Sequence, residues 1–205
     1  GEQSNQTQRK KIDQVATQEW YFVAMQPGSI CILVDPISQI IANGIPVIDM
    51  DTLIAPLDEM WDMGVVTLIA PDNVTLAEAV VSKIVEKMGY SGKIARTGGV
   101  EGHTGAQGRQ QGFWNIVNQY PDIEVVDDQP ADWSAERSAQ LWETIINRHP
   151  DIKGGFFDND DMALSARRVI EGAGLLDQVA IGGVDAMPPA IEAVGRGEMV
   201  ATARN

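Results

Sequence analysis

The sequence is poor in the residues that redox and metal sites need. It contains one cysteine, Cys31, and two histidines, His103 and His149, among 205 residues. A single cysteine excludes an internal disulfide and every CxxC motif, and neither histidine has a ligand partner at metal-binding spacing. Cys31 lies in the stretch GSICILVDP, which is typical of a buried helix, so we interpret it as an inert core residue. We therefore predict no metal site.

Basic residues and long apolar runs are also scarce. Lys and Arg total 15 against 29 Asp and Glu, which gives a formal net charge of -14. Such a surface repels phosphate backbones and anionic lipid, and no apolar run is long enough to cross a bilayer. We therefore predict no nucleic-acid partner and no membrane insertion.

Catalytic and cofactor motifs are missing as well. The chain has no Ser-His-Asp order and no GxSxG nucleophile turn. The glycine-rich stretch TGGVEGHTGAQGRQQG lacks the GK[ST] of a phosphate-binding loop, and it does not open a dinucleotide fold at a first strand. We predict a protein that is not an enzyme and needs no cofactor.

What the chain does contain is a regular alternation of short apolar strands and amphipathic helices. Gly, Pro, Asn and Asp bound the strands, which are expected at 21–26, 45–50, 65–70, 92–98, 123–129, 152–158 and 178–185. Helices are expected at about 3–18, 29–42, 74–89, 105–119, 134–148, 160–171 and 188–195. This order predicts an α/β fold with mostly parallel sheets that helices cover on both faces.

Both ends of the sequence are unusual for such a fold. The chain opens with the polar run EQSNQTQRKKIDQVATQ and stops at GEMVATARN, where another strand begins to form. We expect the sequence to be a piece of a longer protein.

Polar residues follow the carboxyl ends of several predicted strands, where open parallel sheets bind their ligands. Within DNDDMALSAR, residues 158–167, we expect Asn159 to point at a ligand while Asp160 or Asp161 starts the helix. The other candidates at strand ends or early in a helix are Asp51, Glu101, His103, Arg109, Asp132, Trp133 and Asp185. Plain structural roles remain open for the same residues: helix caps for the acids and amide, a surface position for the arginine and a core position for the tryptophan.

These side chains suit a neutral ligand with many hydroxyl groups. Carboxylates and amides accept from or bridge neighbouring hydroxyls, and an arginine donates a rigid fork of hydrogen bonds. An indole stacks on the apolar face of a sugar ring.

Several motifs together resemble the type I periplasmic sugar-binding proteins of the ribose- and galactose-binding kind, the solute-binding family of ABC transporters. They are GIPVIDMDT, PDN, GRQQGF, QPADW, HPDIKGGFFDNDDMAL and GGVDAMPPAIEAVGRGEMVATARN. The resemblance implies two Rossmann-like parallel-sheet lobes that close on one sugar. It implies a partial N-terminal lobe at 1–71, and a C-terminal lobe at 72–205 that ends at the second hinge crossing.

The resemblance also implies which residues bind the sugar. They are Asp51, His103, Arg109, Trp133, Asn159, Asp185 and Asn205, with the histidine the weaker candidate. Thr52 stands where the ribose-binding branch has an arginine, so the pattern allows another pentose, a hexose or a polyol.

The implied function is delivery of a monosaccharide or polyol to an ABC transporter permease. It implies a periplasmic location, or a lipid-anchored extracellular one in a Gram-positive cell, after removal of a signal peptide. The alternative is the effector-binding domain of a LacI-like repressor, which shares this fold. With its N-terminal lobe incomplete, the chain could also self-associate through an open sheet edge.

Overall fold

The computed structural model describes residues 5–205, and the chain divides into two compact units. The first unit is Gly1–Pro71 with Gly102–Gly105, and the second is Asp72–Glu101 with Ala106–Asn205. The expected C-terminal lobe, 72–205, includes residues 102–105. They group instead with the first unit, because the Ile30 amide donates to the Gly102 carbonyl (3.2 Å) and the Leu53 amide to the Thr104 hydroxyl (3.2 Å).

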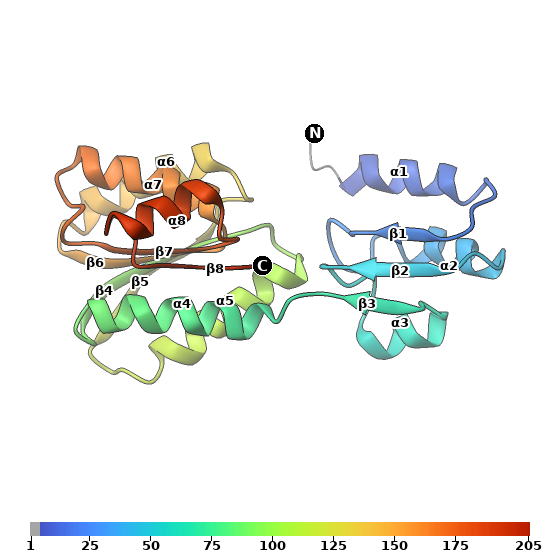
Figure 1. Cartoon of the computed structure of the whole chain (residues 1–205), viewed down its shortest axis with the longest axis horizontal. Coiled ribbons are helices and arrows are strands. Elements are labelled where there is room, and N and C mark those ends of the chain that lie inside the picture. Colours follow the sequence, from blue (N-terminus) through green and yellow to red (C-terminus); the bar gives the residue numbers. More distant parts are fainter. Residues whose placement is uncertain (1–4) are drawn as a thin grey trace. The chain divides into compact units, whose positions relative to one another are not determined.

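The first unit is built on a three-stranded parallel sheet in the order β1-β2-β3. Its elements are α1 (Asn5–Val15), β1 (Val23–Met25), α2 (Val34–Ala42), β2 (Val47–Met50), α3 (Leu57–Met63) and β3 (Thr67–Ile69) (Figure 1). One cluster of buried side chains forms its core, and Ile37 and Ile40 of α2 and Met60 of α3 are fully buried in it.

The second unit is built on a five-stranded parallel sheet in the order β5-β4-β6-β7-β8. Its strands are β4 (Gly92–Gly98), β5 (Ile123–Pro130), β6 (Ile152–Phe157), β7 (Ala180–Val184) and β8 (Ala201–Ala203). Its helices are α4 (Asn73–Lys87), α5 (Thr104–Val117, which begins in the first unit), α6 (Ala135–Arg148), α7 (Asp160–Gly172) and α8 (Pro188–Gly195). Figure 1 shows α4 and α5 on one face of this sheet and α6, α7 and α8 on the other.

Helices on both faces explain the apolar runs in the central strands. Successive residues of a strand point to opposite faces, so Phe156 packs in the cluster under α4 and α5 while Phe157 packs in the cluster under α6 to α8. In the same way, Ile94 packs in the cluster under α4 and α5, and Ala95 packs in the cluster under α6 to α8. An uninterrupted apolar run is therefore what a strand covered on both sides requires.

The expected α/β fold with parallel sheets is confirmed, and each expected strand and helix has a counterpart. Residues 3 and 4 of the first expected helix lie outside the described residues. Two local predictions were wrong. The helix α3 was not anticipated, although Pro56 precedes it and Gly64 ends it in the left-handed conformation (φ 93°), the usual asymmetry of helix ends. Cys31 is exposed in a turn with φ 68°, so it is not a core residue.

Two further properties concern residues 5–205. Among residues 5–205 no helix combines the length and the apolar character that a membrane crossing requires. Within the same range no three His, Cys, Asp or Glu side chains gather as a metal site would require.

Candidate functional site

Four of the expected site residues lie at the carboxyl-end edge of the second unit's sheet. Trp133 follows β5, Asn159 follows β6 and Asp185 follows β7, while Arg109 lies on α5. Because the strands are parallel, their carboxyl ends share one edge, where loops can present side chains to a ligand. The structure brings these residues together around the arginine.

The Arg109 guanidinium is the centre of this group and is almost fully buried, with 4% of the residue exposed. Its Nε donates to Oδ1 of Asn73 (2.9 Å), and its Nη1 donates to the main-chain carbonyl of Asp158. Nη1 also lies 3.8 Å from the Asp185 carboxylate, and the guanidinium carbon is 5.6 Å from the centre of the Trp133 ring. These contacts fix the arginine in one orientation, as rigid recognition of a ligand requires.

Glycines on α5 allow the arginine to reach this position. A side chain at Gly108 would place its Cβ 2.8 Å from the Asn73 Cβ, and one at Gly112 would collide with the Val74 carbonyl. The glycine-rich stretch therefore serves close packing of α5 against the start of α4. That packing brings Arg109 against Asn73, a residue that the sequence analysis did not single out.

A buried ion pair between Arg96 and Asp158 lies next to the site. The Arg96 guanidinium donates to both oxygens of Asp158 (3.2 and 2.6 Å), and a third nitrogen donates to Asp128 (2.7 Å). The Gly99 amide also donates to Asp158 (2.8 Å). Burial raises the pKa of the Asp158 carboxyl, and the Arg96 charge opposes that rise. Asp158 thus points inward, while its carbonyl holds Arg109.

Trp133 sits on a turn of unusual backbone geometry. Both Asp132 (φ 54°) and Trp133 (φ 61°) are left-handed, a conformation that side chains other than glycine adopt rarely. The indole lies so close to Gly99 that a Cβ on that residue would collide with the ring. The indole is therefore held between the end of β4 and Arg109. Its expected stacking on a sugar ring stays a prediction.

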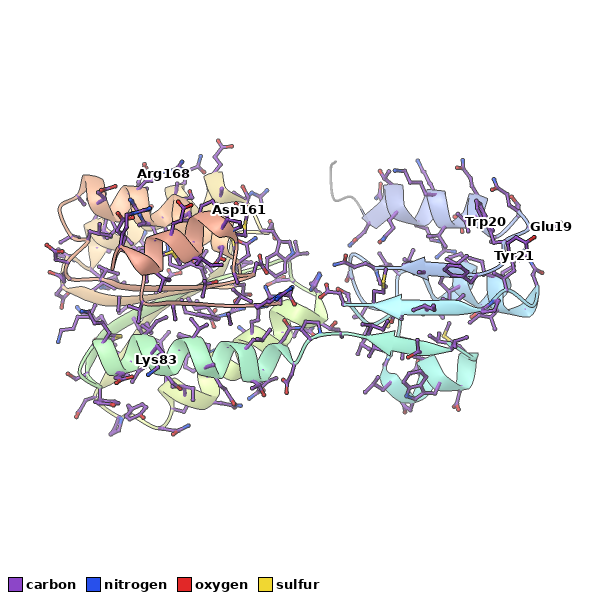
Figure 2. All side chains as sticks on the ribbon, in the orientation of Figure 1. Glu19, Trp20, Tyr21, Lys83, Asp161 and Arg168 are labelled. Carbon is purple, nitrogen blue, oxygen red and sulfur yellow. The ribbon has the colours of Figure 1, made fainter. Side chains whose placement is uncertain are left out.

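The polar residues 159–161 after β6 have separate roles, and α7 begins at Asp160, as expected. Asn159 is itself the helix cap, because its Oδ1 accepts from the Met162 amide (2.9 Å). Asp160 is fully buried and accepts from the Met187 amide (2.9 Å), so it does not act as a cap. Asp161 is exposed on α7 (Figure 2). The capping alternative is therefore realised at Asn159, whereas its contact with a ligand stays a prediction.

Asp185 also lies on a strained turn. Its φ is 118° and that of Ala186 is 52°. The Ala186 amide donates to the Thr202 hydroxyl (3.1 Å), and that hydroxyl lies 2.8 and 2.9 Å from the two Asp160 oxygens. Burial raises the pKa of Asp160 from 3.8 to about 6.

A smaller polar group lies in the first unit around Asp51, which follows β2 with φ 65°. Gln26 donates to the Asp51 carboxylate (2.6 Å), and Nε2 of His103 lies 2.7 Å from the Thr52 hydroxyl and 3.4 Å from Asp51. The Gly105 amide donates to Nδ1 of His103 (3.1 Å). With Nδ1 as an acceptor, a neutral ring carries its proton on Nε2, facing the hydroxyl and the carboxylate.

Asp49 anchors the loop that follows Asp51 by a hydrogen bond. Its side chain is fully buried and accepts from the Ile54 amide (2.9 Å), while its Oδ1 has no hydrogen-bond partner among residues 5–205. Burial raises the pKa of Asp49 from 3.8 to about 6. A neutral carboxyl needs fewer partners than a buried carboxylate, which fits this position.

The remaining candidates contribute less to either group. Asn205 is exposed, two residues beyond β8. Glu101 is exposed too, and Asp132 forms an ion pair with Arg137. Sequence reasoning did not indicate the supporting roles of the buried Asn73, Arg96, Asp158 and Asp160 or of the half-buried Thr202. Asn73, Asp158 and Asp160 lie next to a strand or helix end, which was their only sequence signal, whereas Arg96 and Thr202 lie within strands.

A surface hollow in the first unit does not involve these groups. It has a volume of about 620 Å³ and is lined by residues 16–20, 39 and 43–45. These residues precede β1 and β2 or lie on α2. Trp20 of the hollow and the neighbouring Tyr21 are both exposed (Figure 2). The hollow thus lies toward the amino ends of these strands, whereas Asp51 follows a carboxyl end.

Comparison with known families gives one match over almost the whole chain. The family described as periplasmic binding protein domain matches residues 1–204.

Comparison with individual relatives gives partial matches. The D-allose-binding periplasmic protein of Escherichia coli K12 is 28% identical over 200 residues, which are 96% of this chain and 64% of the relative. The ribose import binding protein of the same organism is 30% identical over 178 residues, 85% of this chain and 60% of the relative. A D-apiose import binding protein of Actinobacillus succinogenes is 36% identical over 117 residues, 57% of this chain and 38% of the relative. The chain therefore spans less than two thirds of these curated relatives.

Solved structures agree on the fold. A solute-binding protein of Actinobacillus succinogenes with bound D-allose is 26% identical, with a TM-score of 0.87 over 96% of this chain and 69% of its own. The arabinose-transporter binding protein of Shewanella sp. ANA-3 is 23% identical, with a TM-score of 0.91 over 98% of this chain and 67% of its own.

Proposed function

Because the chain belongs to the periplasmic binding protein domain family, we propose that it binds a monosaccharide or polyol without converting it. We further propose that the whole protein delivers this ligand to the permease of an ABC importer. The observation that carries the proposal is the buried Arg109 guanidinium, held against Trp133 and Asp185 at the carboxyl-end edge of the larger sheet.

The polar atoms of the second unit suit hydroxyl groups. Arg109 uses Nε and Nη1 within the unit, so Nη2 is the donor that we expect to meet the ligand. Asn159 uses Oδ1 for its cap, and its Nδ2 is the second expected donor. The Asp185 carboxylate, 30% exposed, is the expected acceptor. Two donors and one acceptor that neighbouring residues hold in place match the alternating hydroxyls of a sugar.

The names of the relatives favour import over gene regulation. They are called D-allose-binding periplasmic, ribose import binding and D-apiose import binding proteins, and none of these names indicates an enzyme or a repressor. We therefore propose transport over the LacI-like alternative and over catalysis. A leader for export in the parent gene would support transport, whereas an encoded helix-turn-helix would support the repressor.

The first unit supplies the second part of the proposal. Asp51 and His103 present a carboxylate and an imidazole near each other, and we propose that they also contact sugar hydroxyls. For the location we propose the periplasm, or a lipid-anchored extracellular position in a Gram-positive cell.

We also propose that copies of this chain self-associate through the first unit. The strand register places Ala24, Ile48, Met50, Thr67 and Ile69 on one face of its sheet, and none of them belongs to the core cluster of the unit. Ile69 is 64% exposed, and the face has no charged side chain that would repel a second copy. Light scattering should give a mass above that of a monomer, which Ile69→Lys lowers and the matched control Ile191→Lys, at an exposed position of α8, does not. A strict monomer rejects self-association.

Titration calorimetry tests the binding function directly. The chain is titrated with D-allose, D-ribose, D-apiose, L-arabinose and myo-inositol as probes, and at least one should bind with saturation and one site. Arg109→Lys should abolish or strongly weaken that binding, whereas Arg168→Lys, a change at an exposed arginine of α7 (Figure 2), should not. Failure of all the probes, or turnover of any of them, would count against the proposed function.

A further inference from the structure

The turn that presents Asp185 is held by an unusual backbone. Asp185 and Ala186 are consecutive residues with positive φ, 118° and 52°. Each such residue other than glycine typically costs about 1–3 kcal/mol, so the conformation persists only where neighbouring groups enforce it. The turn sits between β7 and α8, two elements with fully buried apolar residues.

Two side chains far away in the sequence enforce this turn. The Thr202 hydroxyl accepts from the Ala186 amide (3.1 Å) and contacts the Asp160 carboxylate (2.8 and 2.9 Å), to which it donates. The same carboxylate accepts from the Met187 amide (2.9 Å). Two successive backbone amides of the turn are thus held by one hydroxyl and one carboxylate. We call these two side chains the brace.

The surroundings of Asp160 are tightly packed. Asp160 is fully buried, and its Oδ1 lies so close to Gly183 of β7 that a Cβ there would collide with it. The Thr202 side chain projects from β8, which pairs with β7 at Gly183. A β-branched threonine keeps few rotamers on a strand, so its hydroxyl is presented in one direction.

We propose that Asp160 and Thr202 are positioning residues that determine ligand affinity through Asp185. The brace fixes the left-handed turn, and the turn places the Asp185 carboxylate 3.8 Å from Nη1 of Arg109. Neither brace residue contacts the ligand. This inference rests on the proposed sugar-binding function, because it assigns a cause to the geometry of the same site.

A purely structural role for the brace predicts different behaviour. In that case the loss of the Thr202 hydroxyl would lower stability, and its effect on affinity would not depend on the residue at 185. A positioning role predicts that the effect on affinity disappears once the Asp185 carboxylate is removed, because the brace then has no carboxylate to place.

The test compares Thr202→Val, which removes the hydroxyl at nearly constant shape, with Thr202→Ser, which keeps it. Both are combined with Asp185→Ala, and affinity for D-allose and D-ribose is measured by calorimetry. We expect Thr202→Val to weaken binding about tenfold, the effect of about one hydrogen bond, and Thr202→Ser to restore it. In the Asp185→Ala background Thr202→Val should change affinity less than twofold. Equal losses in both backgrounds would overturn the proposal.

Hydrogen exchange separates this inference from the proposed function. Thr202→Val should lower the protection of the Ala186 amide, while Thr202→Ser and the amides of α6 keep theirs. Unchanged protection at Ala186 in Thr202→Val rejects the brace, whether or not a sugar binds. If none of the five probes binds the unaltered chain although exchange identifies the brace, the sugar-binding proposal fails and the affinity role of the brace fails with it.

Discussion

The two units differ in how completely helices cover their sheets. In the second unit α4 and α5 lie on one face and α6 to α8 on the other, and each face has its own core cluster. In the first unit a single cluster covers one face. Of the ten exposed large hydrophobic residues among residues 5–205, eight lie in the first unit: Trp20, Tyr21, Phe22, Met50, Leu57, Trp61, Val66 and Ile69.

This difference shows what a parallel sheet requires. Parallel strands are apolar on both sides, so a sheet with helices on one side only leaves an apolar face toward solvent. The second unit has a core cluster on each face of its sheet, whereas the described residues of the first unit form one cluster on one face. The second unit should therefore be the more stable of the two and should present its ligand groups more rigidly.

The largest expected effect concerns the cores. Phe157→Ala removes a fully buried ring from the second unit and should lower its unfolding free energy by about 3–5 kcal/mol. At dilutions where light scattering gives a monomer, Ile69→Ser on the bare face of the first unit should change stability by less than about 0.5 kcal/mol. Denaturant unfolding followed by circular dichroism measures both. Comparable losses would mean that the bare face is covered in solution.

Ligand affinity should depend most on the second unit. Arg109→Lys keeps the charge but removes the fork that bonds Asn73 and the Asp158 carbonyl, and we expect a loss of about 100-fold in sugar affinity. In the first unit, Asp51→Asn should weaken binding about tenfold, because a neutral amide replaces a charged acceptor. Calorimetry gives both values. The reverse order would move the centre of recognition to the first unit.

The pH dependence of stability should appear in both units. Burial raises the folded-state pKa of Asp160 and of Asp49 from 3.8 to about 6. Their stabilising contribution is therefore complete below about pH 3.8 and is lost as the pH rises through 6. The difference in unfolding free energy between Asp160→Asn and the unaltered chain should therefore shift in favour of the variant by on the order of 2 kcal/mol from pH 4 to pH 7. Asp49→Asn should behave similarly.

A matched control is available for this pH dependence. Asp161 is exposed next to Asp160, so Asp161→Asn should leave the pH profile of the unfolding free energy unchanged. Thermal or denaturant unfolding at several pH values measures each profile. If Asp160→Asn matched the control, the buried carboxyl would be ionised in the fold at no free-energy cost.

The smallest expected effect concerns His103 in the first unit. His103→Gln keeps a donor near Thr52 and Asp51 but loses the acceptor that bonds the Gly105 amide. We expect a loss of about three- to tenfold in affinity, the value of about one hydrogen bond. A larger loss than that of Arg109→Lys would reverse the comparison between the units.

The fold was largely predictable because its signals are local. The apolar run IKGGFF predicts a strand, and the periodic spacing of VTLAEAVVSKIVEK predicts a helix. Both are present, as β6 and α4. The helix α3 is short, seven residues, and its stretch LDEMWDM mixes three acids with four apolar residues, of which only Met60 is buried. It therefore lacked a periodic signal that would identify it.

The site was predictable only in part. Arg109, Trp133 and Asp185 do meet, as the carboxyl-end rule for parallel strands anticipates. Asn159 proved to be a helix cap, and Asp160, the first residue of α7 as expected, proved to be a buried support as well. Neighbouring acids in one short run look alike in sequence, and only burial separates them.

By itself the sequence determined the α/β alternation, the parallel sheets and the shortlist of polar residues at strand ends, because backbone propensity and hydrophobic period act over a few neighbouring residues. The tertiary structure alone decided which acids are buried supports and which face outward, and which sheet has one bare face. Those outcomes depend on contacts between distant segments, such as Asp160 with Thr202 and Arg96 with Asp158, and local sequence does not specify such contacts.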